Sequence, residues 1–221
     1  MLGVLGLKAT CVAMLAACSL VALQSRAIAE EERVHANVGS FWNYETTDEI
    51  KQTKLIFETT LTEANGDERV IRPNNRGQSA STVWVYDKNW NLAMLGAFKY
   101  QPNNGQGIPE PLQIGAKSKA DVTFTQQLAT GWTDPRPMAV QVEVISTENA
   151  TTKAGEFETY RLEITTTVRG SANQPLSVSE TKTVMWFAPK IDHWVRTQFE
   201  HRTDGHLLSK SSSELIEYRV R

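Results

Sequence analysis

Apolar and polar side chains alternate with a period of two residues along much of this chain. In residues 140–144, 160–164 and 216–220, every even-numbered side chain is apolar and every odd-numbered one is polar or charged. Successive side chains of a β-strand point to opposite faces, so this pattern predicts strands with one buried and one solvated face. The sequence shows no amphipathic helix pattern longer than two turns, which favours an all-β fold.

Short turn sequences separate the alternating segments. Asn65-Gly66 lies between residues 55–61 and 68–72, and an Asn-Gly pair accepts the positive φ angles of a tight hairpin. Ala154-Gly155 separates two further segments in the same way. The other expected hairpins join residues 83–86 to 92–100 and residues 178–187 to 194–202.

The spacing of these segments predicts one antiparallel domain over residues 40–221, a meander of about nine to eleven strands. A curved open sheet, a closed barrel and a sandwich all fit the pattern. Residues 101–115 contain three prolines and three glycines, so neither strand nor helix is expected there. Loops of this length are often functional lids or flexible spacers.

The N-terminus has the three parts of a secretory signal peptide. Lys8 precedes an apolar run over residues 9–23, and the small-residue sequence Ala27-Ile-Ala29 predicts cleavage before Glu30. The apolar run is shorter than the roughly 20 residues that a helix needs to cross a bilayer, so no transmembrane span is expected after cleavage. Residues 30–39 are charged and small, and we interpret them as a linker.

Leu15-Ala-Ala-Cys18 also resembles a bacterial lipobox, in which Cys18 would become a lipidated N-terminus. The sequence stays apolar over residues 19–23, where a lipoprotein usually turns polar. Both cysteines, Cys11 and Cys18, fall inside the signal segment. The cleaved form therefore has no thiol for a disulfide, a cysteine nucleophile or a cysteine-bound zinc.

Charge gives no support for nucleic-acid binding. The net charge is −2, and residues 1–29 contain two basic and no acidic side chains, so the remaining chain is more negative still. Together with the signal segment, this composition predicts an exported protein. The expected location is the periplasm, or the outer membrane as a lipoprotein if Cys18 is modified.

Several short motifs occur in order along the chain: Gly39-Ser-Phe-Trp-Asn-Tyr44, Tyr86-Asp87 with Asn91-Leu92, Ala154-Gly-Glu-Phe-Glu-Thr-Tyr-Arg-Leu162, Trp186-Phe-Ala-Pro189 with Trp194-Val-Arg196, and Glu214-Leu-Ile-Glu-Tyr218. This order resembles a family of exported bacterial β-proteins of unknown function. The resemblance implies an envelope location and a curved antiparallel sheet, but no reaction and no site residues. The chain departs from the family where Asp192-His193 replaces a glycine before Trp-Val-Arg.

Residues that could carry catalysis or bind a metal do not form a convincing pattern. His201 and His206, with Glu200 and Asp204, flank an expected turn, but this spacing imposes no coordination geometry. The chain lacks a Gly-x-Ser-x-Gly motif, and Asp192-His193 is expected in an ordinary turn. We therefore predict no catalytic residue, no metal and no cofactor.

Aromatic residues are the most informative side chains. The six tryptophans all follow the signal segment, and on strands most are expected in the core. Trp84 and Tyr86 share one face of their strand while Val83 and Val85 occupy the other, so both faces are apolar. Such a strand is central in a sandwich or lines a ligand cavity with its second face. The predicted ligand-binding residues are Trp84, Tyr86, Trp132 and Trp186.

These observations favour a non-enzymatic envelope protein that binds a lipid or another amphiphile, or an envelope protein partner, through an aromatic sheet face. A structural or assembly protein whose tryptophans all lie in the core is the first alternative. A secreted hydrolase is the second.

Overall fold

The computed structural model describes residues 33–75, 78–79, 82–133, 135–170 and 177–221. The expected signal peptide, its cleavage site and Cys18 lie outside these residues. Among the described residues, no helix is long and apolar enough to cross a membrane.

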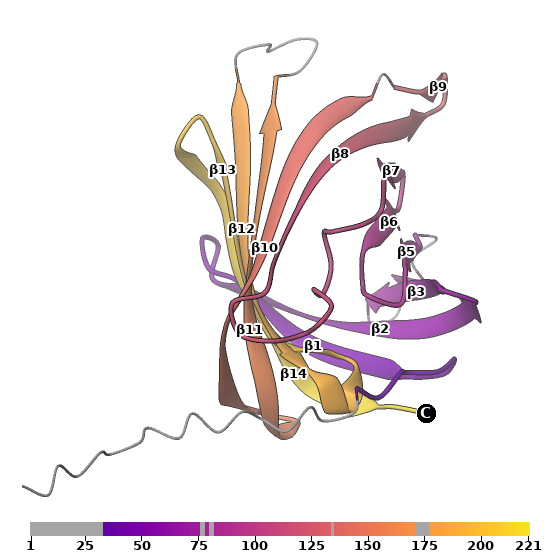
Figure 1. Cartoon of the computed structure of the whole chain (residues 1–221), viewed down its shortest axis with the longest axis vertical. Helices are drawn as coiled ribbons and strands as arrows, with labels where there is room; N and C mark the ends of the chain where they lie inside the picture. The colour runs from indigo at the N-terminus through magenta and orange to yellow at the C-terminus, as the bar shows by residue number, and fades with distance from the viewer. Residues whose placement is uncertain (1–32, 76–77, 80–81, 134, 171–176) are drawn as a thin grey trace, which may run out of the picture. The chain divides into compact units, whose positions relative to one another are not determined.

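A single antiparallel sheet closes on itself (Figure 1). β8 pairs with β7 on one side and with β10 on the other, from Arg136 opposite Phe124 to Glu143 opposite Lys117. Two further strands, β4 (Gln78–Ser79) and β9 (Gly131–Trp132), pair with β3 and β8 at the side of the ring. The ring contains β1 (Phe41–Asp48), β2 (Thr53–Asn65), β3 (Glu68–Asn75), β5 (Trp84–Tyr86), β6 (Leu92–Leu95), β7 (Phe98–Gln101), β8 (Lys117–Leu128), β10 (Arg136–Thr152), β11 (Gly155–Arg169), β12 (Val178–Ala188), β13 (His193–Thr203) and β14 (His206–Arg219).

The structure confirms the all-β antiparallel prediction and selects the barrel over the open sheet and the sandwich. The hairpin at Asn65-Gly66 is also confirmed, since β2 and β3 meet there and Gly66 has φ +62°. The expected count of nine to eleven strands is too low, because the ring alone contains twelve within the described residues. β5, β6 and β7 have only three or four residues each, too few to show an alternation of their own.

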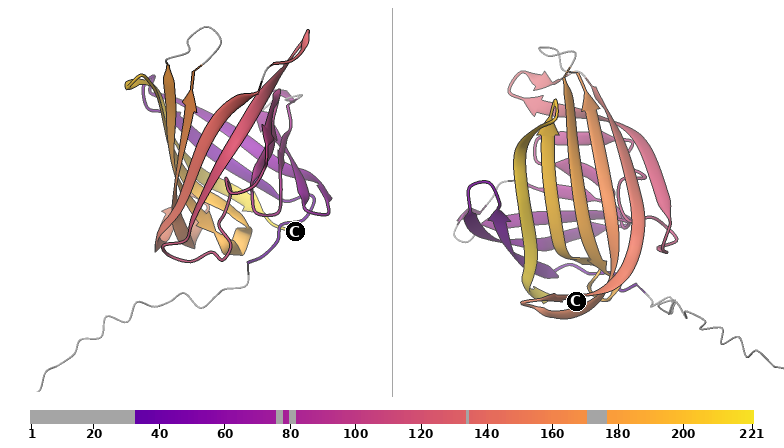
Figure 2. Two further views of the ribbon diagram at one scale, coloured as in Figure 1. Left: turned by 45° about the horizontal axis from the view of Figure 1, so that its top comes forward. Right: turned by 90° about the vertical axis from the view of Figure 1, so that its left-hand side faces the viewer.

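Turns alternate between the two ends of the barrel, because every neighbouring pair is antiparallel. At one end, inward-facing side chains such as Trp42, Tyr44 and Phe187 are completely buried, and we call this the packed end. Toward the other end, inward-facing residues of β11 and β12 such as Thr166 and Thr181 are only partly buried. We call this end, which carries the β8–β10 and β13–β14 connections, the mouth (Figure 2).

The loop from β7 to β8 is fixed to the packed end. The Asn91 Oδ1 atom accepts hydrogen bonds from the Gln106 and Gly107 amides at 2.8 and 2.7 Å. The Ile108 amide donates to the Asn89 carbonyl at 2.7 Å. The segment contains neither strand nor helix over residues 102–116, as expected, but these contacts attach it to the barrel.

We expect Gly107→Ala to detach this loop locally. A Cβ at position 107 would lie 2.2 Å from the Asn89 carbonyl oxygen, so the backbone must shift, at a cost of about 1–3 kcal/mol. Hydrogen exchange of the amides at 106–108 should accelerate. Gly66→Ala is the control, because it faces open space and strains only its own φ angle. Unchanged amide protection in Gly107→Ala would contradict the close approach.

Candidate functional site

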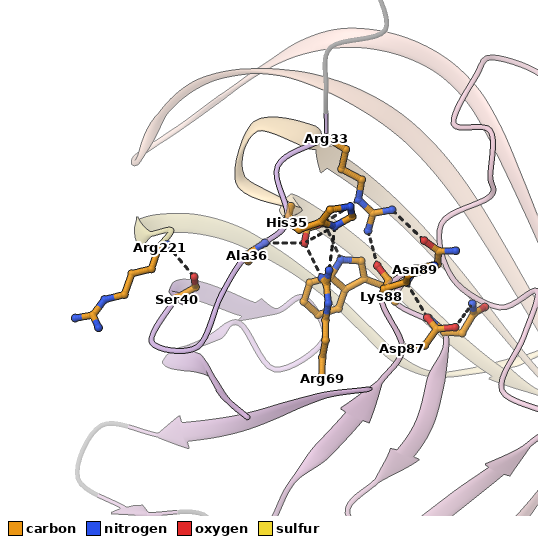
Figure 3. Close-up of polar contacts among 12 residues, drawn as sticks. Arg33, His35, Ala36, Ser40, Arg69, Asp87, Lys88, Asn89 and Arg221 are labelled. Atoms are coloured by element: carbon orange, nitrogen blue, oxygen red, sulfur yellow. Dashed lines mark hydrogen bonds and ion pairs between the residues drawn. The ribbon is translucent and has the colours of Figure 1, made fainter. Parts of the chain in front are cut away.

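A buried carboxylate organises the packed end. Asp192, at 0% exposure, directly follows the 3-10 turn η1 (Pro189–Ile191) between β12 and β13. The Arg33 Nε and Arg69 Nη1 atoms donate to its two oxygens at 2.8 and 2.6 Å. Figure 3 shows Arg33, His35 and Arg69 gathered around this point. Asp192 thus lies in a turn, as expected, but the turn is buried and ion-paired, and His193 is the first residue of β13.

Two more donors complete the hydrogen bonding of Asp192. The Ala36 amide donates to Oδ2 at 3.1 Å and the Trp90 indole N–H to Oδ1 at 3.3 Å. A carboxylate has about four acceptor positions, so four donors leave none for a ligand. We name Asp192, Arg33, Arg69, Ala36 and Trp90 the Asp192 cluster. Its chemistry is that of a structural link, because it joins the entering chain, β3, the β5–β6 loop and the β12–β13 turn.

The entering chain is part of this arrangement. Residues 33–39 belong to the segment interpreted as a linker, yet Arg33 and Ala36 bind Asp192. The Val34 amide donates to the Pro189 carbonyl at 3.2 Å. Arg33 also donates to the Asn89 side chain and to the Lys88 carbonyl. The described part of this segment thus contacts both the β12–β13 turn and the β5–β6 loop.

We predict that Asp192→Asn lowers the free energy of unfolding by about 3–5 kcal/mol, because two guanidinium groups would lose their buried counter-charge. Urea unfolding at neutral pH measures the change. Asp121→Asn is the control, since Asp121 is exposed on β8 and its replacement should cost less than about 0.5 kcal/mol. Equal losses in the two variants would show that the Asp192 cluster does not support the fold.

His193 lies beside this cluster in an aromatic stack. Its ring stacks on Trp42 with centroids 4.1 Å apart, and its Nδ1 atom lies 2.5 Å from the Tyr44 hydroxyl. That hydroxyl also donates to the Trp194 carbonyl at 2.7 Å. Burial lowers the pKa of His193 well below its ordinary value, and burial raises the pKa of Tyr44. The folded protein therefore holds a neutral imidazole.

Stability should consequently fall as the pH drops below about 6.5. The unfolded chain binds a proton on His193 near that pH, while the folded chain does not, so acid favours unfolding. The slope should approach about 1.4 kcal/mol per pH unit in urea unfolding between pH 7.5 and 5. His193→Asn should flatten this dependence, whereas replacement of the exposed His206 by Asn should not. An undiminished slope in His193→Asn would rule out this origin.

A second feature is a group of aromatic rings on the inner face of β5, β7 and β8. Trp84 pairs with Ile71 and Tyr86 with Arg69, and both partners are buried inward residues of β3. We call the group the aromatic wall. Each of its residues is partly buried, and burial raises the pKa of its two tyrosines. It consists of Trp84, Tyr86, Phe98, Tyr100 and Phe124.

Ring contacts join the members of the aromatic wall that lie on β7 and β8. The ring centroids of Tyr100 and Phe124 are 6.1 Å apart, and those of Phe98 and Phe124 are 6.3 Å apart. Ile164 on β11 and Phe199 on β13 also face inward and are partly exposed. Because the ring of strands is closed, exposed surface on its inner face borders the interior. The inner face of the barrel therefore carries apolar residues that are only partly buried on β5, β7, β8, β11 and β13.

The four predicted ligand-binding residues occupy three different places. Trp84 and Tyr86 lie together in the aromatic wall. Trp132 is 49% exposed on β9, at the mouth. Trp186 is 7% exposed on the outer face, between the guanidinium groups of Arg161 and Arg196, and its indole N–H donates to Glu148.

Sequence reasoning missed Phe98, Tyr100 and Phe124. The alternation of aromatic residues in 98–100 and of Val122 with Phe124 would have placed them on one face. Only the register shows that this face joins the one that carries Trp84.

One pair of side chains resembles part of a hydrolytic site. The Ser179 hydroxyl lies 2.8 Å from His201 Nε2 near the mouth. Among the described residues, no carboxylate contacts the other ring nitrogen of His201, so a triad is not assembled there. The described residues also contain no group of three or more candidate metal ligands.

Comparison with known proteins shows similarity of fold. No protein-family model and no curated protein matches the chain. A candidate lipoprotein from Parabacteroides distasonis matches with TM-score 0.54 and 16% identity over 83% of this chain and 96% of its own. A candidate exported protein with a YmcC-like fold from Bacteroides fragilis matches with TM-score 0.50 and 14% identity over 83% and 97%. The barrel thus agrees with the fold implied by the family resemblance.

Proposed function

We propose that this chain is an exported, non-enzymatic protein of the cell envelope that binds an apolar or amphiphilic ligand inside its barrel. The aromatic wall is the observation that carries the proposal. Its residues are only partly buried although the sheet closes around them, whereas a barrel core that serves stability alone is filled by its own side chains. A concave apolar surface of this kind suits the chain of an amphiphile.

The two ends of the barrel have different tasks in this proposal. The Asp192 cluster and the stack on His193 fill the packed end and hold the strands in place. The mouth gives access to the aromatic wall. Trp84 and Tyr86 are the proposed ligand contacts, while Trp132 and Trp186 lie away from this surface.

The proposed location rests on the N-terminal sequence and on the similar structures. Residues 1–29 have the parts of a signal peptide. The two similar structures are a candidate lipoprotein and a candidate exported protein. Cleavage before Glu30 would give a periplasmic protein, and modification of Cys18 would give an outer-membrane lipoprotein.

We expect hexadecanoate or lysophosphatidylcholine to shift the tryptophan emission of the purified protein to shorter wavelength, because a bound chain removes water from Trp84. Trp84→Phe should lose most of this shift and keep the ligand adduct in native mass spectrometry. Trp132→Phe should keep the shift, because Trp132 is exposed on β9 at the mouth. An unchanged spectrum and no adduct with either amphiphile at saturation would reject the proposed function.

A further inference from the structure

Arg136, the first residue of β10, points into the barrel. Arg136 pairs with Phe124 and alternates with Met138 and Val140, which are buried inward residues. The centre of its guanidinium group lies 5.1 Å from the centroid of the Phe124 ring. A permanent positive charge therefore lies against the aromatic wall, near the mouth.

This charge is incompletely paired. Arg136 Nη2 donates to the Gly170 carbonyl at 2.8 Å, but the Nε atom is buried and has no hydrogen-bond acceptor. Among the residues that the structure describes, no carboxylate forms an ion pair with Arg136. A buried donor without a partner is costly, and it is more costly on a charged group. The folded protein therefore has a hydrogen-bond donor without an acceptor and a positive charge without a counter-ion at Arg136, and an anionic acceptor would satisfy both.

Other arginines of the barrel differ in this respect. Arg69 faces the interior at the packed end, where Asp192 neutralises it. Arg161 and Arg196 lie over Trp186 on the outer face. Arg136 thus combines three properties within the described structure: an inward position, a missing counter-ion and contact with the aromatic wall.

We infer that the ligand of the proposed site is an anionic amphiphile, whose carboxylate or phosphate group binds Arg136 while its apolar chain lies on the aromatic wall. This inference rests on the proposed function. A planar guanidinium group binds carboxylate and phosphate oxygens through paired N–H donors, and the low polarity of the surroundings strengthens such bonds. The anion would supply both the counter-charge and the acceptor that Arg136 lacks.

The test compares three ligands that have the same alkyl chain and different head groups. Dodecanoate, dodecyl phosphate and neutral 1-dodecanol, each kept below its aggregation concentration, are titrated into the full-length protein and scored by native mass spectrometry and tryptophan emission. We expect at least one anion to bind about tenfold more tightly than the alcohol. The two anionic ligands distinguish a carboxylate from a phosphate.

Variants of Arg136 test whether this residue causes the preference for anionic ligands. Arg136→Met should remove the advantage of the anion and leave binding of 1-dodecanol unchanged, and Arg136→Lys should retain part of the advantage. Arg219→Met is the matched control, because Arg219 also lies over a phenylalanine ring, 5.0 Å from Phe41, but on the exposed side of β14. Thermal unfolding should show that all three variants fold.

The possible results separate the two proposals. Equal binding of anions and alcohol by the unchanged protein would overturn the role of Arg136 and leave the apolar site standing. An anion preference that survives in Arg136→Met would overturn it as well. No binding of any of the three ligands would reject the amphiphile site itself.

Discussion

The fold depends on a carboxylate that is completely removed from water. Burying an ion is costly, and Asp192 remains buried because two guanidinium groups, an amide and an indole N–H all converge on it. These donors come from parts of the chain that are far apart in sequence. The packed end therefore forms only when these distant parts of the chain come together. The barrel does not need a filled interior toward the mouth to stay closed.

This distribution of contacts explains how the barrel can be stable although its inward residues toward the mouth are only partly buried. Interiors normally reach crystal-like packing density, and open apolar space reduces the dispersion energy available for folding. Here Trp42, Tyr44 and His193 are fully buried at one end. The residues of the aromatic wall can remain partly exposed because the complete burial at the packed end offsets their loss of packing.

The sequence predicts most of the strands but few of the residues of the candidate functional site. Period-two alternation and the Asn65-Gly66 turn depend on neighbouring residues, so they identify hairpins without reference to the rest of the chain. Closure of the barrel depends on the pairing of β8 with β10, and both open and closed sheets give the same alternation. Asp192 is a turn residue, as expected, but its buried ion pairs were not predicted because its partners are distant, Arg33 being 159 positions away. The position of Trp186 illustrates the same limit, because alternation along a strand shows which residues share a face but not which face lies inside the barrel.

Closure of the ring also restricts how another protein can recognise this one. Each of the twelve ring strands has a hydrogen-bonded neighbour on both sides over at least part of its length. Within the described residues, only the two-residue strands β4 and β9 lie at the side of this path. Strand addition, by which many partners attach to an open sheet, is therefore restricted to stretches that are paired on one side only, such as residues 117–122 of β8. Over the rest of the ring, another protein would contact side chains and loops, a surface that can diverge rapidly while the barrel stays the same.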